Sequence, residues 1–191
     1  MEPYRFHKKH SIDLIPFGAI AQDGTVVLDN PPMELSVYGC KEVTEEAVVV
    51  TKHFKVVTLA GLCILKLIAY SERPEYRSKD LEDYFFIVVN YYQIAGEELF
   101  NGQYDDLIEG DFEVNIASAR MLGRNMALVL NKNETLKNSV INILMQQLQG
   151  FTEPEIDQMY KVRDEDNNLV VKLKLVFETI KGIKDIVHDP N

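Results

Sequence analysis

The feature that most constrains the fold of this chain is a change of residue pattern at Leu59. Before this point, two runs rich in β-branched residues, 47–51 and 54–58, are separated by only two residues, a pattern typical of a β-hairpin. After it, apolar residues recur at helical spacing until Pro74, which predicts one helix over residues 59–72. A chain that passes from strands to helices in this way is expected to belong to the α/β class, of the α+β kind.

Further strands and helices are expected on either side of this point. Strands are predicted at residues 11–15 and 25–28, with Pro31-Pro32 ending that unit. Helices are predicted at residues 79–94, with Ser78 as N-cap, and at residues 114–129, 136–148 and 169–187. A helix is favoured over a strand for the last segment, although residues 170–176 alternate, because helical spacing continues through residues 179–187.

Composition and charge limit the classes of function. No segment approaches the roughly 18 apolar residues that a membrane span needs, and residues 1–10 are polar and basic, so a cytoplasmic protein with reduced thiols at Cys40 and Cys63 is expected. The formal net charge of −10 disfavours non-specific binding to nucleic acid. Carboxylates concentrate in residues 97–113, and basic residues concentrate in residues 73–79. An anionic ligand is therefore expected at the basic segment 73–79.

Lys66 is the most unusual charged residue, because it stands inside the apolar segment 62–70. Its ammonium group must reach water or find a partner, since burying it unpaired costs several kcal/mol. Tyr70 and Arg73 follow at i+4 and i+7 and share its helical face. Two cations and a hydroxyl on one face suit a polyphosphate. The alternative is that Lys66 only marks the solvent edge of an amphipathic helix.

A second set of charged residues lies at the start of the next predicted helix. Arg77 and Lys79 precede Asp80, and Asp80 and Asp83 are spaced i, i+3 on one helical face, while Lys79 and Asp83 are spaced i, i+4. This spacing alone favours a capped, ion-paired helix start.

Three blocks of residues, 12–18, 59–70 and 77–83, occur in an order that resembles nucleotidyltransferase-like proteins of the abortive-infection AbiEii type. The resemblance covers about residues 10–95. It implies a small mixed sheet built from the N-terminal third, flanked and followed by helices, with residues 1–95 as a partial core and residues 96–191 as a mostly helical region packed on it. The implied activity is transfer of a nucleotide from a nucleoside triphosphate, with Mg²⁺, to an unknown acceptor.

The resemblance also implies roles for individual residues. Lys66 would contact phosphate, and Asp80 would be a catalytic or orienting acid. Asp13 would occupy the strand position of the third catalytic carboxylate and bind metal. Three neighbouring cations, Lys79, Arg77 and Arg73, are expected to bind phosphate as well. Asp83 and Tyr70 are expected to support the site.

The chain departs from this family at its beginning. The family opens with a Gly-Ser helix start that cradles phosphates, followed by an Asp-x-Asp strand pair that holds two metal ions. Neither occurs here, and Asp105-Asp106 are adjacent residues that would point to opposite sides of a strand. Either the chain is truncated and a longer enzyme exists, or it is an inactive remnant that binds a nucleotide, an RNA or a protein.

The remaining alternatives concern partners. A nucleotide is expected as ligand, with transfer RNA or an antitoxin protein as further candidates and no membrane partner. A rival reading is an interaction protein, a homodimer formed through the tyrosine-rich helix 84–92. The four histidines lack metal-ligand spacing, and neither a Walker loop nor a Gly-x-Ser-x-Gly elbow occurs.

Overall fold

A computed structural model of the chain describes residues 4–6, 10–12, 15–29, 32–110, 112–163 and 168–185. The chain divides into two compact units, Met1–Lys41 and Glu42–Asn191. The first unit holds four strands paired as two antiparallel hairpins, β1 (Tyr4–Phe6) with β2 (His10–Ile12) and β3 (Thr25–Asp29) with β4 (Pro32–Ser36). A short helix, α1 (Cys40–Glu45), lies across the boundary of the two units.

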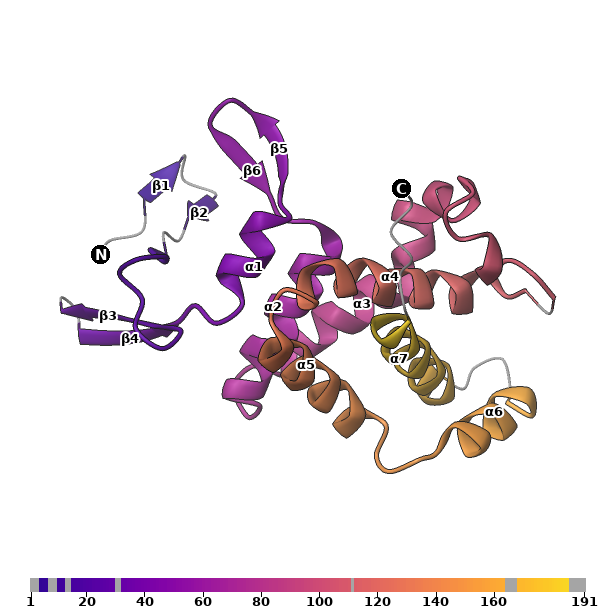
Figure 1. Ribbon diagram of the computed structural model, residues 1–191. Helices are drawn as coiled ribbons and strands as arrows, with labels where there is room; N and C mark the ends of the chain where they lie inside the picture. The colour runs from indigo at the N-terminus through magenta and orange to yellow at the C-terminus, as the bar shows by residue number, and fades with distance from the viewer. Residues whose placement is uncertain are drawn as a thin grey trace. The chain divides into compact units, whose positions relative to one another are not determined.

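The second unit is mainly helical. It contains the hairpin β5 (Val48–Thr51) and β6 (Phe54–Val56), the helices α2 (Leu59–Glu72), α3 (Ser78–Ala95), α4 (Val114–Leu130), α5 (Glu134–Gln147), α6 (Glu153–Lys161) and α7 (Asn168–Lys184), and the 3-10 helices η1 (Gly96–Phe100) and η2 (Asp105–Leu107). Helices α2, α3, α4, α5 and α7 pack against one another around the core, and α6 packs on α7 (Figure 1). No helix among the described residues has the length and apolar character needed to cross a bilayer.

The α+β class expected from the sequence is confirmed, but its strands are arranged differently. Within the described ranges, the strands form separate antiparallel pairs, and the expected mixed sheet is not formed. Strand β4 begins at Pro32, although Pro31-Pro32 was predicted to end this pair of strands. In the pairing with β3, Pro32 lies opposite Asp29 and Ser36 lies opposite Thr25. Proline is compatible with the first position of a strand because its missing N–H is not needed there.

The predicted helices agree well with the observed ones. Helix α2 has the expected bounds, and α7 is helical through the segment that alternates in sequence. Its buried Leu173, Val176 and Ile180 recur at helical spacing, and their burial against the other helices decides between helix and strand. Ser78 is not an N-cap, because it is already the first residue of α3 and Arg77 precedes it.

Two short helices were not expected from the sequence. Helix α6 begins with a capping box, in which the Thr152 backbone N–H and hydroxyl both donate to the Glu155 carboxylate. Helix α1 has only one buried side chain, Val43. Both helices are short, and a helix of about two turns shows too little periodicity to be recognised in the sequence.

Helices α4 and α7 make the most extensive helix–helix contact in the described part of the chain. They cross where Gly123 of α4 faces Gly182 of α7. A Cβ atom at Gly123 would overlap the Thr179 carbonyl oxygen, and one at Gly182 would overlap the Arg120 carbonyl oxygen. Neither obstacle is the end of a flexible side chain, so the crossing requires glycine on both helices.

We expect Gly182→Ala to destabilise the protein by about 1–3 kcal/mol, because the new methyl group forces two packed backbones apart. At a helical site without this obstacle, glycine to alanine would instead stabilise the protein by up to about 1 kcal/mol. The sign of the change in unfolding free energy therefore shows whether the two backbones are in contact. Urea denaturation measures the free energy of unfolding, with Asn115→Ala on the exposed side of α4 as control. A stabilising Gly182→Ala would contradict the close crossing.

Candidate phosphate-binding site

Four of the residues singled out in the sequence meet between α2 and α3. Lys66 Nζ lies 2.8 Å from Asp80 Oδ1 and 2.7 Å from Asp83 Oδ2. Arg77 Nε donates to Asp80 Oδ2 at 2.6 Å. These four residues are called the Lys66 cluster below. The side chains of Lys66 and Asp80 are 29% and 12% exposed, so the cluster lies at the edge of the core and is still reached by solvent.

A tight turn between α2 and α3 positions the cluster. Helix α2 ends at Glu72 because Pro74 cannot continue it, and the Tyr76 and Arg77 backbone N–H groups both donate to the Arg73 carbonyl at 3.0 Å. The chain therefore reverses within a few residues. The buried face of α3, which includes Tyr84, Ile87 and Val88, packs toward the core and brings the first turn of α3 alongside the middle of α2.

Mutual pairing governs the ionisation of the cluster. Burial by itself lowers the pKa of Lys66, but hydrogen bonds to Asp80 and Asp83 outweigh it and leave this pKa above its ordinary value. Burial raises the pKa of Asp80, yet the bonds from Lys66 and Arg77 outweigh that effect, so the Asp80 pKa is lowered. Lys66 and Asp80 are therefore both charged at neutral pH.

The other predicted site residues lie outside these contacts. Arg73 and Lys79 are exposed at the ends of α2 and α3, and Tyr70 is half-buried one turn after Lys66. They place two further cations around the same corner without joining the cluster. Asp13, the residue expected to bind metal, lies outside the described residues.

The cluster does not form a metal site by itself. Asp80 uses both carboxylate oxygens on cations, and Asp83 uses Oδ2. Among the described residues, no group of three or more acidic, histidine or cysteine side chains could hold a metal ion. Magnesium is commonly bound through one or two carboxylates together with substrate phosphates. A two-metal site at this corner would therefore need carboxylates beyond those of the described residues.

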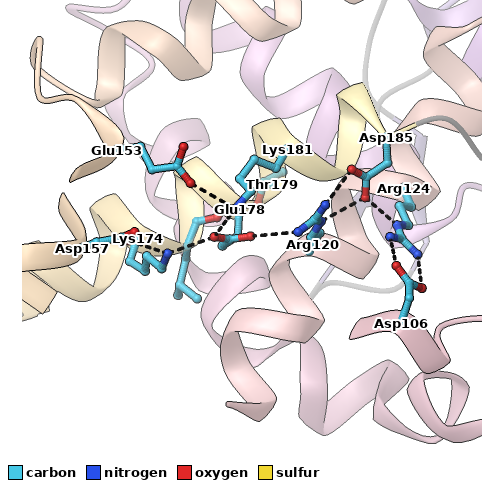
Figure 2. Close-up of polar contacts among 11 residues, drawn as sticks. Asp106, Arg120, Arg124, Glu153, Asp157, Lys174, Glu178, Thr179, Lys181 and Asp185 are labelled. Carbon is cyan, nitrogen blue, oxygen red and sulfur yellow. Dashed lines mark hydrogen bonds and ion pairs between the residues drawn. The ribbon is translucent and has the colours of Figure 1, made fainter. Parts of the chain in front are cut away.

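A larger ionic network, not expected from the sequence, connects α4 with α7 and the segments beside them (Figure 2). Glu178, which is buried, accepts hydrogen bonds from Lys174 at 2.9 Å and Lys181 at 3.2 Å. Asp185 accepts bonds from Arg120 at 2.9 and 3.0 Å and from Arg124 at 2.7 Å. Arg124 continues to Asp106, while Lys174 reaches Asp157 and Lys181 reaches Glu153.

The sequence contained a signal for part of this network. Lys174 and Glu178 are spaced i, i+4, and Glu178 and Lys181 are spaced i, i+3, which places all three on one face of α7. The partners on other segments are 17 to 65 residues away and could not be assigned by spacing. Every cation of the network is paired with at least one carboxylate, and Glu178 at its centre is buried, so we interpret it as a structural clamp between packed helices.

A pocket beside α2 does not coincide with the Lys66 cluster. A pocket of about 320 Å³ lies at the other end of the helix, beside its N-cap Thr58. It is lined mostly by apolar residues of α2, α3 and α4, with Glu46 and Glu98 at its edge. A ligand that meets the Lys66 cluster would therefore bind at the surface of the α2–α3 corner and not in this pocket.

The lowered pKa of Asp80 predicts an acid-dependent loss of stability. A carboxyl group whose pKa is lower when folded stabilises above its unfolded pKa of about 4, and this contribution is lost as pH falls toward the folded pKa. We therefore expect Asp80→Asn to be less stable than the wild type at pH 7 and to lose less of its remaining stability below about pH 4. Urea denaturation across this range measures both effects.

The matched control is Glu82→Gln, because Glu82 is exposed on the same helix. It should follow the wild-type curve. An Asp80→Asn protein whose unfolding free energy falls as steeply as that of the wild type below pH 4 would contradict the ion-paired state of Asp80.

Comparison of the chain with protein-family models, with curated proteins and with solved structures found no match.

Proposed function

We propose that the corner between α2 and α3 is the later half of a nucleotidyltransferase-like site, in which Lys66 and Arg77 contact the phosphates of a nucleoside triphosphate. The observation that carries the proposal is the meeting of Lys66, Arg77, Asp80 and Asp83, which are spread over two helices. A purely solvent-facing Lys66 would not need two carboxylate partners.

The charges around the cluster suit a nucleotide that carries Mg²⁺. Arg73 and Lys79 are exposed at the same corner and add positive charge beside the balanced cluster. A triphosphate approaching Lys66 meets two carboxylates, which repel it unless a divalent ion accompanies it. A Mg²⁺ ion carried by the nucleotide would supply that charge, Asp83 would help to hold it, and Asp80 would keep Lys66 and Arg77 oriented.

Turnover needs metal-binding carboxylates that the described residues do not supply. We propose that the chain transfers a nucleotide to an unknown acceptor when a segment bearing those carboxylates completes the site. Without such a segment, the same corner acts as a nucleotide-, RNA- or protein-binding module. Transfer RNA is the first acceptor to test, and an antitoxin protein is a candidate partner.

Calorimetric titration with each nucleoside triphosphate and Mg²⁺ tests the proposal. We expect Lys66→Met to weaken binding by about 10- to 100-fold, the value of a hydrogen bond to a charged group. The matched control is Lys174→Met, because Lys174 is also paired with two carboxylates, Asp157 and Glu178, but belongs to the clamp on α7. Both variants should be compared well below their unfolding temperatures.

Equal weakening in the two variants would show a general effect of stability and would contradict the site. Absence of binding by the wild-type protein would do the same. If binding is present, incubation with a labelled nucleoside triphosphate, Mg²⁺ and transfer RNA then separates the two forms of the proposal. A labelled RNA product supports the enzyme, and binding without product supports the binding module.

An interaction protein is the second candidate, and one observation favours it. Several large apolar side chains of the second unit are exposed, on β5, on β6 and on α3. The tyrosines expected to form a dimer surface are not all available, because Tyr84 and Tyr91 are buried. On α3 the exposed apolar side chains are instead Phe86, Val89, Tyr92 and Ile94.

A further inference from the structure

The β5–β6 hairpin exposes apolar side chains to an unusual degree. Phe54 keeps 71% of its surface accessible, and Val48, Val49, Val50 and Val56 are all more than half exposed. Because successive residues of a strand point to opposite faces, adjacent exposed valines make the hairpin apolar on both faces. An isolated two-stranded hairpin is only marginally stable in water, so such a surface favours being covered.

The same hairpin is basic in an acidic protein. Lys52, His53 and Lys55 lie within residues 47–58, which contain no aspartate or glutamate, whereas the whole chain has a net charge of −10. Neither lysine has an ion-pair partner in the part of the chain that the structure describes. A partner that covers the hairpin should therefore combine apolar side chains with carboxylates.

This chain itself carries a surface of that chemistry at the end of α3 and in η1. Tyr92, Ile94 and Phe100 are exposed there next to Glu97 and Glu98, and these five residues are called the acidic patch. No lysine or arginine occurs between Lys79 and Arg120 in the sequence. A pocket of about 320 Å³, lined in part by Tyr92, Ile94, Glu97 and Phe100, offers a hollow for a side chain.

The chain segments that flank the hairpin lie near the acidic patch. The pocket beside the N-terminus of α2 is lined by Glu46 and Thr58, which flank the hairpin, and by Ile94 and Glu98 of the patch. Two surfaces of opposite charge on the same chain allow a two-fold arrangement, in which each copy places its hairpin on the patch of the other. Such an arrangement covers both surfaces in both copies and leaves none to recruit a third chain.

We propose that this protein forms a two-fold homodimer in which the β5–β6 hairpin of each copy binds the acidic patch of its partner. Apolar contacts come from Phe54 and the valines, and Lys52 and Lys55 face Glu97 and Glu98. The proposal does not depend on nucleotide binding.

Sedimentation velocity and light scattering at low ionic strength test this arrangement. We expect a species of two chains, whose dissociation constant rises with salt because exposed charges are screened. Charge reversal in Lys52→Glu/Lys55→Glu should raise the dissociation constant by about tenfold or more, and Glu97→Lys/Glu98→Lys should do the same. Phe54→Ser should also weaken the dimer without unfolding the chain, because Phe54 is exposed.

Mixing the two charge-reversed proteins provides the sharpest outcome. In the mixed pair, both hairpin–patch contacts again join opposite charges, so association should return to near the wild-type level. The control Lys161→Glu/Lys184→Glu makes the same change of net charge at exposed positions of α6 and α7 and should leave the dimer intact. A monomeric wild-type protein, a series of larger species, a dimer unaffected by hairpin reversal, or a mixture that fails to associate would each overturn the proposal.

Discussion

The close approach of α4 and α7 at Gly123 and Gly182 is the constraint on which most of the second unit depends. Two helices that touch through glycine leave no room for other side chains at the crossing, so their charged residues gather on either side of it. Arg120 and Arg124 flank Gly123 on α4, and both reach Asp185, which follows α7, across this crossing. Removing either glycine would therefore disturb the packing of the core and the ion pairs together.

The two ionic systems of the second unit differ in accessibility. The clamp on α7 has a buried carboxylate, Glu178, at its centre and alternates in sign, so it stabilises the packing. The Lys66 cluster lies at an exposed corner, with Arg73 and Lys79 beside it. Lys66 is already paired with two carboxylates, so a phosphate group without a metal ion would gain little free energy by binding it. We therefore propose a nucleotide that carries Mg²⁺, because the ion offsets part of the phosphate charge.

Local patterns in the sequence predicted the long helices, but the ion pairs of Lys66 with Asp80 and Asp83 were not predicted, because they depend on how α2 and α3 pack. The bounds of α2 follow from apolar spacing and Pro74, and the β5–β6 hairpin follows from two β-branched runs. The prediction of a mixed sheet was wrong, because runs of β-branched residues indicate where strands form but not which strands pair with one another. The Arg120–Asp185 and Arg124–Asp106 pairs could not be predicted, since they depend on how α4 crosses α7.

The most direct test of the central claim follows the Lys66 ammonium group itself. Heteronuclear NMR of lysine side chains resolves individual Nζ groups and reports the change when a carboxylate partner is exchanged for a phosphate. On addition of ATP with Mg²⁺, we predict a shift of the Lys66 resonance while that of Lys174, held by Asp157 and Glu178, stays in place. An unchanged Lys66 resonance at saturating nucleotide, or equal shifts of both lysines, would contradict a phosphate site at this corner.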